Sequence, residues 1–155
     1  MAGTIDARLN SLGLALPSAP TPVANYVPWV RTGSLVFVSG QLPVIDGKVT
    51  CTGKVGADVN VAAAAAAART CALNLIAQVR AACDGDLDRV RRVVKLTGFV
   101  ACTPDFAEQP AVVNGASDVM VEIFGDAGRH ARAAVGAPAL PRNATVEVEA
   151  VFEVA

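Results

Sequence analysis

The stretch Thr145-Val146-Glu147-Val148-Glu149-Ala150-Val151-Phe152-Glu153-Val154, near the end of the chain, alternates between apolar residues and residues that are mainly glutamate. An alternation of period two indicates a β-strand with two unlike faces. The face suited to a core carries Val146, Val148, Ala150, Phe152 and Val154. The opposite face carries Thr145, Glu147, Glu149, Val151 and Glu153. This strand, Ala144–Val154, therefore predicts a sheet with helices on one face and carboxylates on the other, where they meet water, a polar cleft or another subunit.

Two helices are predicted to cover the apolar face. In Asp58–Cys83, apolar residues recur at steps of three and four, seven alanines give high helix propensity, and Asp58 is the expected N-cap. In Ala111–Phe124 the same spacing recurs, and Gly125 ends the helix. The alanine-rich helix is expected to pack closely on the sheet. Its longest apolar run is too short to span a bilayer.

Valine-rich segments bounded by turn residues predict the other strands. An Asp46-Gly47 turn is expected within one of them, and Gly98 is expected to mark a bulge in another. The predicted strands are Asn25–Arg31, Leu35–Ser39, Val44–Cys51, Arg89–Ala101 and Ala131–Ala137. The first three are expected to form a meander. The order βββ-α-β-α-ββ then predicts an α+β two-layer sandwich, in which one mostly antiparallel sheet carries two helices on one face.

The length of 155 residues predicts a single domain, 1–155. Residues 1–22 are its N-terminal part, with a short helix over Thr4–Leu12 capped by Thr4 and a proline-rich extended lead-in over Pro17–Pro22. With 53% hydrophobic residues the chain is too apolar to be disordered. A formal net charge of −1 argues against nucleic-acid binding driven by bulk electrostatics. A half-apolar open sheet face favours symmetric association into a ring, with sites between subunits.

The cysteines are widely spaced and there is one histidine, so the usual zinc motifs are absent. No apolar run near the N-terminus has the length of a signal peptide. These features favour a reduced, cytoplasmic protein without a bound metal.

The sequence has no Walker loop, no G-x-S-x-G and no H-E-x-x-H, so chemistry must come from other groups. Arg132 begins an apolar strand, where burial of a guanidinium without an anion is costly. The closing strand is expected to place Glu147 near it. Two interpretations are compatible with this spacing: a site in which Arg132 binds a substrate carboxylate while Glu147 holds a water, and a structural ion pair between the two.

Two sequence signatures carry a resemblance to a known family. The first is Arg132, then Leu140-Pro141, then Val146-Glu147-Val148-Glu149-Ala150. The second is Tyr26, then Ser39-Gly40-Gln41-Leu42-Pro43. In this order and spacing, the chain resembles the reactive intermediate deaminase superfamily, the YjgF-like or Rid proteins that are also labelled endoribonuclease L-PSP. The resemblance spans roughly residues 22–154.

The resemblance implies a chorismate-mutase-like fold and a homotrimer with three clefts between subunits. It implies hydrolysis of small reactive enamines and imines to 2-oxo acids and ammonia, with no metal or cofactor. Arg132 would bind the substrate carboxylate and Glu147 would position or activate the water. The residues implied to line the cleft are Tyr26, Ser39, Gly40 and Asn114. His130, two residues before Arg132, is expected on the same side of the strand, where it contacts substrate or makes a surface or inter-subunit hydrogen bond.

Two positions depart from the family pattern. Ala134 stands where the archetypes often have cysteine, and Gly136 stands where they have an acidic residue. Both favour a second hypothesis, a trimer that binds small carboxylates or acts like a chaperone without catalysis. A third hypothesis, an endoribonuclease or translation inhibitor, follows from the family's older label and from the basic cluster Arg89, Arg91, Arg92 and Lys95. The same cluster is also compatible with a solvated strand paired with nearby aspartates.

Overall fold

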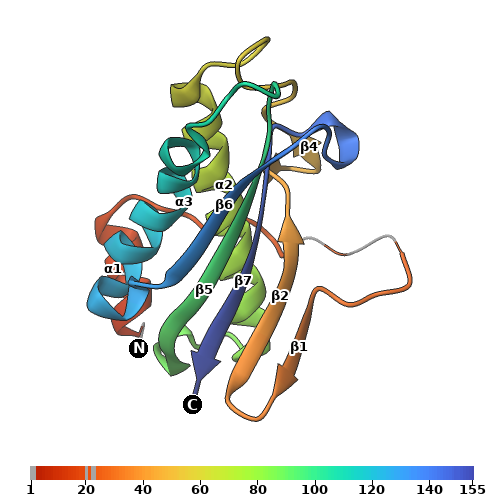
Figure 1. The fold of residues 1–155 in the computed structure, drawn as a ribbon. Coiled ribbons are helices and arrows are strands. Elements are labelled where there is room, and N and C mark those ends of the chain that lie inside the picture. Colours follow the sequence, from red (N-terminus) through yellow and green to blue (C-terminus); the bar gives the residue numbers. More distant parts are fainter. Residues whose placement is uncertain (1–2, 20, 22–23) are drawn as a thin grey trace.

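The computed structural model describes residues 3–19, 21 and 24–155. A five-stranded sheet of order β1-β2-β7-β5-β6 lies against α2 and α3, which share one of its faces (Figure 1). The helices are α1 (Thr4–Ser11), α2 (Val61–Ala82) and α3 (Gln109–Phe124), with the short 3₁₀ turns η1 (Leu87–Arg89), η2 (Gly125–Gly128) and η3 (Pro141–Asn143). The strands are β1 (Trp29–Thr32), β2 (Leu35–Gln41), β3 (Val44–Ile45), β4 (Lys48–Val49), β5 (Val90–Ala101), β6 (Ala131–Ala137) and β7 (Val146–Val154). The predicted α+β two-layer architecture is confirmed.

The closing strand β7 lies at the centre of the sheet and pairs antiparallel with both β2 and β5. Its two faces differ as the alternation predicts. The apolar residues of β7 are buried beneath the helices, whereas Glu147 is half-buried and Glu149 is exposed on the other face. The strand that determines the fold therefore contributes to the core with every second residue, and to the open face with the residues between.

The edge strand β6 pairs with β5 in parallel, unlike every other pairing in this sheet. Parallel neighbours need a long crossover, and α3 provides it between β5 and β6. As a result β5 separates β6 from β7. The expectation that the closing strand lies next to the Arg132 strand is wrong, because strand order in the sheet does not follow chain order.

The two main helices lie very close together. The backbone of Ala65 on α2 occupies the space that a Cβ at Gly115 on α3 would need. The N-cap of α2 is Asn60, whose Oδ1 accepts a hydrogen bond from the Ala63 amide at 2.8 Å, and not the predicted Asp58. By length and composition alone α2 is apolar enough to cross a membrane, but 56% of its most apolar window is buried inside the fold. Its hydrophobicity is thus accounted for by the core.

Three local predictions are wrong for identifiable reasons. The β3–β4 hairpin forms its own two-stranded sheet, so the early strands are not one meander. At Gly98 the β5–β7 register is continuous, with no bulge; the glycine is required because Val113 of α3 occupies the space of a Cβ. Thr4 lies within α1 and does not cap it. The Asp88 carboxylate accepts hydrogen bonds from the amides of Thr4 and Ile5, both at 2.8 Å.

The first predicted strand is shorter than expected, since β1 begins at Trp29 and not at Asn25. The predicted lead-in over Pro17–Pro22 includes positions 20 and 22, which lie outside the described residues.

Candidate functional site

Four polar side chains converge where α3 lies against the edge strand β6. We call this group, Asn114, Ser117, His130 and Arg132, the Arg132 edge. The guanidinium Nη1 of Arg132 donates to Asn114 Oδ1 at 2.8 Å and to Ser117 Oγ at 3.1 Å. Asn114 and Ser117 are three residues apart on a helix, so their side chains share one face. The sequence-predicted residues Arg132, Asn114 and His130 are therefore brought together.

The side of the Arg132 guanidinium that carries Nε and Nη2 is open. Within the part of the chain that the structure describes, neither Nε nor Nη2 has an acceptor, and Arg132 makes no ion pair. A planar guanidinium with one edge held and one edge free suits two-point binding of a carboxylate.

His130 completes the Arg132 edge. Its Nδ1 lies 2.6 Å from the Gly128 carbonyl oxygen and its Nε2 lies 2.9 Å from Ser117 Oγ. Burial lowers the pKa of His130; the Gly128 hydrogen bond opposes this, and the positive charge of Arg132 lowers it further. Burial and the Arg132 charge thus favour the neutral imidazole.

A second group of predicted residues lies on the open side of the sheet. We call Ser39, Gly40 and Glu147 the Glu147 face. Between Val38 and Gln41 the β2–β7 register shifts, so that Ser39 and Gly40 together face a single residue of β7. This is the two-against-one pattern of a β-bulge, which is common beside active sites. A Cβ at Gly40 would collide with Oε1 of Glu147, so the glycine lets the backbone pass against the carboxylate.

The Glu147 carboxyl group is half-buried, and no donor among the described residues hydrogen-bonds it. Burial raises the pKa of Glu147, and the neighbouring negative charge of Glu149 raises it further. A carboxylate with a raised pKa is a stronger base than one in water, which suits it to accept a proton from a bound water.

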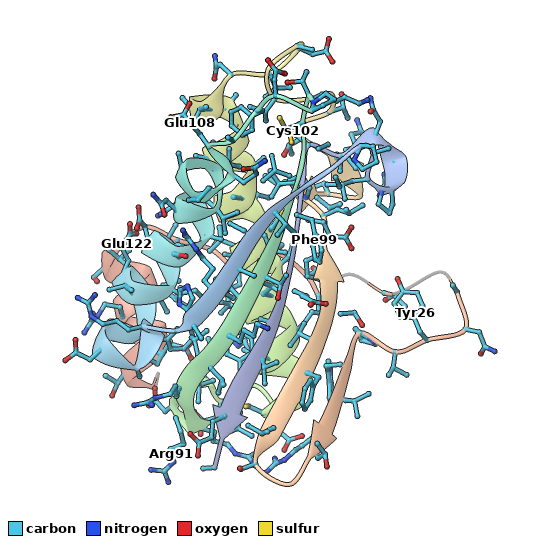
Figure 2. All side chains as sticks on the ribbon, in the orientation of Figure 1. Tyr26, Arg91, Phe99, Cys102, Glu108 and Glu122 are labelled. Carbon is cyan, nitrogen blue, oxygen red and sulfur yellow. The ribbon has the colours of Figure 1, made fainter. Side chains whose placement is uncertain are left out.

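Next to the Glu147 face, a hollow of about 320 Å³ is lined by Tyr26, Ser39, Gly40 and Arg142 among others. Ser39 Oγ donates to the Val27 carbonyl at 2.9 Å, which joins the loop before β1 to the bulge. Tyr26 stands on that loop, away from the sheet, and is 56% exposed (Figure 2). Three of the predicted cleft residues therefore lie together. Arg142 is not among the predicted cleft residues, although it directly follows the Leu140-Pro141 signature.

Within one chain the two groups lie on opposite sides of the sheet. Arg132 pairs in register with Leu96, which is buried under the helices, whereas Glu147 pairs with Phe99, which lies on the open side. The alternative interpretation of a structural Arg132–Glu147 ion pair is therefore wrong for a single chain. No bond joins the two, and β5 lies between their strands.

The open side of the sheet has a further hollow of about 470 Å³, where Val30, Phe37 and Val151 lie beside Lys95 and Glu149. Val30 is 54% exposed and Phe37 is 47% exposed. Exposed apolar side chains that gather in one patch are typical of an interaction surface.

Ser117 is the member of the Arg132 edge that sequence reasoning missed. Its spacing of three from Asn114 on a predicted helix is the signal that could have identified it. Among the described residues no group of three or more His, Cys, Asp or Glu side chains is arranged to hold a metal ion, and the four cysteines are free.

This chain is similar to known proteins in both sequence and fold. A family model described as "YjgF/chorismate_mutase-like, putative endoribonuclease" matches residues 6–154. Protein TCP17 of Trypanosoma cruzi is 51% identical over 152 residues, which are 97% of this chain and 94% of that protein. A 2-iminobutanoate/2-iminopropanoate deaminase of Salmonella typhimurium is 36% identical over 138 residues, 89% of this chain and 94% of that protein. The crystal structure of Atu1372 from Agrobacterium tumefaciens, a protein described as of unknown function, has a TM-score of 0.91 and 54% identity, covering 97% of this chain and 92% of that one.

Proposed function

The chain belongs to the YjgF/chorismate-mutase-like family, and from this premise we propose that it hydrolyses small 2-imino and enamino acids to 2-oxo acids and ammonia. In this reaction water adds to the carbon of a C=N bond, and the tetrahedral product then loses ammonia as its C–N bond breaks. One water is consumed for each ammonia released. Because the imine is already reactive, the protein needs to orient it and to deliver water, with no redox step.

The observation that carries the proposal is that Nε and Nη2 of the Arg132 guanidinium are open. Asn114 and Ser117 fix its position through Nη1, so Nε and Nη2 are presented in a defined direction. A carboxylate bound there would have its adjacent imine carbon held at a fixed distance from the strand. This orientation converts an encounter with water into a reaction within one complex.

Glu147 is the group we assign to the water. Its raised pKa and its lack of a donor among the described residues leave its oxygens available to accept a proton as water attacks. The bulge at Ser39 and Gly40 brings the Gly40 backbone next to it. Tyr26, Ser39 and Gly40 would then form the wall of the cleft on the Glu147 side.

Arg132 of one copy and Glu147 of another must meet for these groups to act together, since they lie on opposite sides of the sheet in one chain. A contact between two different surfaces is head-to-tail, and three copies form the smallest closed ring of that kind. The exposed apolar patch around Phe37 supports association through the open side of the sheet. We therefore propose a homotrimer with the sites between subunits.

The test is turnover of 2-iminobutanoate or 2-aminoacrylate, generated in the cuvette by a pyridoxal-phosphate-dependent dehydratase, with 2-oxo acid formation followed above the spontaneous rate. We expect clear acceleration by the wild type and a loss of about 100-fold in Arg132→Ala. Arg91→Ala, an exposed arginine at the far end of β5, is the matched control and is expected to match the wild type. Equal rates for wild type and Arg132→Ala would refute the proposal.

A second candidate is binding of small carboxylates without turnover. Ala134 favours it, because this neighbour on the helix side of β6 brings no reactive group to Arg132. Binding of a 2-oxo acid that is lost in Arg132→Ala, combined with no acceleration of imine hydrolysis, would select this candidate over the first.

A further inference from the structure

Ser117 links the arginine to the only histidine of the chain. Its Oγ lies 3.1 Å from Arg132 Nη1 and 2.9 Å from His130 Nε2. All three side chains are half-buried at the edge of the sheet. The hydroxyl is thus shared between a permanent cation and a group that can become one.

The chemistry of the partners fixes which atom donates in each hydrogen bond. The Gly128 carbonyl can only accept, so His130 Nδ1 carries a hydrogen and donates to it at 2.6 Å. In a neutral imidazole the other nitrogen, Nε2, is then an acceptor, and the Ser117 hydroxyl donates to it. Arg132 can only donate, so the Ser117 oxygen accepts from Nη1. With neutral His130 the Ser117 proton is therefore engaged away from the guanidinium.

We infer that Ser117 is a second ligand-binding group of the Arg132 edge, whose hydroxyl proton becomes available to a bound carboxylate when His130 takes up a proton. This inference rests on the proposed function, because it concerns the anion that Arg132 binds. It makes carboxylate binding proton-linked: affinity rises as the pH falls through the titration of His130.

The hydrogen-bond pattern requires this direction. A protonated imidazole has donors on both nitrogens, so Nε2 now donates to the Ser117 oxygen. Ser117 then accepts from both His130 and Arg132, and its own proton must turn to another acceptor. A carboxylate oxygen that accepts from the Arg132 Nη2 hydrogen on the Nη1 side would lie beside Ser117 and supply one.

Charge acts in the same direction. A proton on His130 adds a second positive charge near Arg132, and an anion bound to Arg132 reduces the repulsion. In the free protein burial and the Arg132 charge both lower the pKa of His130. Neutralising Arg132 with a bound carboxylate should raise that pKa, and by reciprocity protonation of His130 should raise the carboxylate affinity by the same factor.

The other charged groups around His130 do not replace Arg132 in this role. From η2, Asp126 pairs with Arg129 at 3.5 Å in exposed positions. From α3, Glu122 pairs with Arg69 at 2.9 Å, and Asp118 is exposed. From β5, Lys95 lines the hollow on the open side of the sheet. Glu147 also titrates and would reach the same ligand in an assembled site, so its contribution must be separated by a variant.

The single histidine makes the test direct. Imidazole NMR signals of the full chain belong to His130 alone, and its pKa is measured with and without saturating 2-oxobutanoate, whose carboxylate stays ionised from pH 5 to 8. We expect the ligand to raise the pKa by about one unit, which corresponds to a roughly tenfold gain in affinity between pH 8 and pH 5. The affinity itself is followed by calorimetry over that range.

Variants assign the linkage to its groups. His130→Gln should flatten the affinity profile to within about twofold, whereas Glu147→Gln should retain most of the slope. Ser117→Ala should weaken binding mainly at low pH, because it removes the proton that the charged state provides. Ser11→Ala, an exposed serine on α1, is the matched control and should leave the profile unchanged. An affinity that is independent of pH in the wild type, or a profile unchanged in His130→Gln, overturns the inference.

A failure of the proton linkage can be distinguished from a failure of the proposed function. If the wild type binds the 2-oxo acid with no pH dependence, the linkage fails and the proposed function stands. If it binds no 2-oxo acid at any pH, both fail. In that case Arg132→Gln still shows whether the network exists, because loss of the arginine charge should raise the His130 pKa.

Discussion

The Arg132 edge and the Glu147 face differ in how far their own chain satisfies them. At the edge, Asn114 and Ser117 hold the guanidinium and Gly128 holds His130, so every named group has an ordered partner. On the face, the Glu147 carboxyl group has no donor among the described residues, and the same side of the sheet carries exposed apolar side chains such as Phe37. The Arg132 edge is held in place by hydrogen bonds within one chain. The Glu147 carboxyl group is left without a hydrogen-bond donor from the described residues of that chain. Under the proposed function, this difference would assign carboxylate binding and water activation to separate halves of an assembled site.

The largest effect is expected from Glu147→Gln, which tests whether the face supplies the catalytic base. Loss of a general base should lower turnover by ~10³-fold with little change in carboxylate affinity. The stability of the folded state, unlike turnover, should increase in this variant at high pH. Because the folded-state pKa of Glu147 is raised, its carboxyl stabilises the fold at low pH, and this contribution is lost as the pH rises through that pKa.

The glutamine variant should therefore melt at a higher temperature than the wild type at pH 8 and at a similar temperature near pH 4. Thermal melts across this range check the sign. A lower melting temperature at pH 8 would show that the carboxylate has a stabilising partner after all.

Mixing two inactive variants is the sharpest way to separate the halves. Arg132→Ala supplies an intact Glu147 face, and Glu147→Gln supplies an intact Arg132 edge. If each site takes one half from each of two neighbours, random equal mixing in a ring should restore about a quarter of the wild-type sites. Co-expression with two different affinity tags yields the mixed species, whose turnover is compared with that of each parent.

The control co-expresses Arg132→Ala with the Arg132→Ala/Glu147→Gln double variant, which offers no arginine and should recover nothing. Mixed species no more active than the mean of their parents would place both halves in one chain, against the geometry described above.

A smaller effect is expected from Gly40→Ala on the Glu147 face. The added Cβ meets the far end of a flexible side chain, so the fold should accept it, but Oε1 of Glu147 must move. A displaced catalytic group should cost about tenfold in turnover with a melting temperature near that of the wild type.

The smallest effect is expected from Asn114→Ala at the Arg132 edge. Ser117 continues to hold Nη1, so the guanidinium loses one of its two partners. We expect KM to rise about threefold with kcat nearly unchanged, because the loss falls on positioning of the carboxylate. A larger fall in kcat than in affinity would instead place Asn114 in contact with the reacting atoms.

Much of this arrangement is predictable from the sequence because it depends on periodicity. The alternation of residues 145–154 predicts which side of β7 is buried, and the three- and four-residue spacing predicts α2 and α3. The resemblance carried by the signatures around Arg132 and Ser39 predicts most residues of the candidate site, but not Ser117 or Arg142. What the sequence does not contain is the strand order, since nothing in Ala131–Ala137 says that it pairs with β5 and not with β7.

Caps and close contacts are hard to predict for a related reason. The acceptor for Thr4 and Ile5 is Asp88, more than eighty residues away, and the atom that requires Gly98 belongs to Val113 on another element. Such requirements arise from tertiary packing and leave no local pattern. Ser117 is the exception, because its helical spacing from Asn114 is visible in the sequence once Asn114 is singled out.

The capping of α1 by Asp88 has a consequence for the order in which the chain acquires structure. The first helix has only eight residues, too few for stability alone, and its two free amides are satisfied by a carboxylate that is synthesised much later. During translation α1 cannot gain this cap until η1, which carries Asp88, has been synthesised. Amide hydrogen exchange should find α1 opening far more often than the central strands, as a late addition that can detach while the rest of the protomer stays folded.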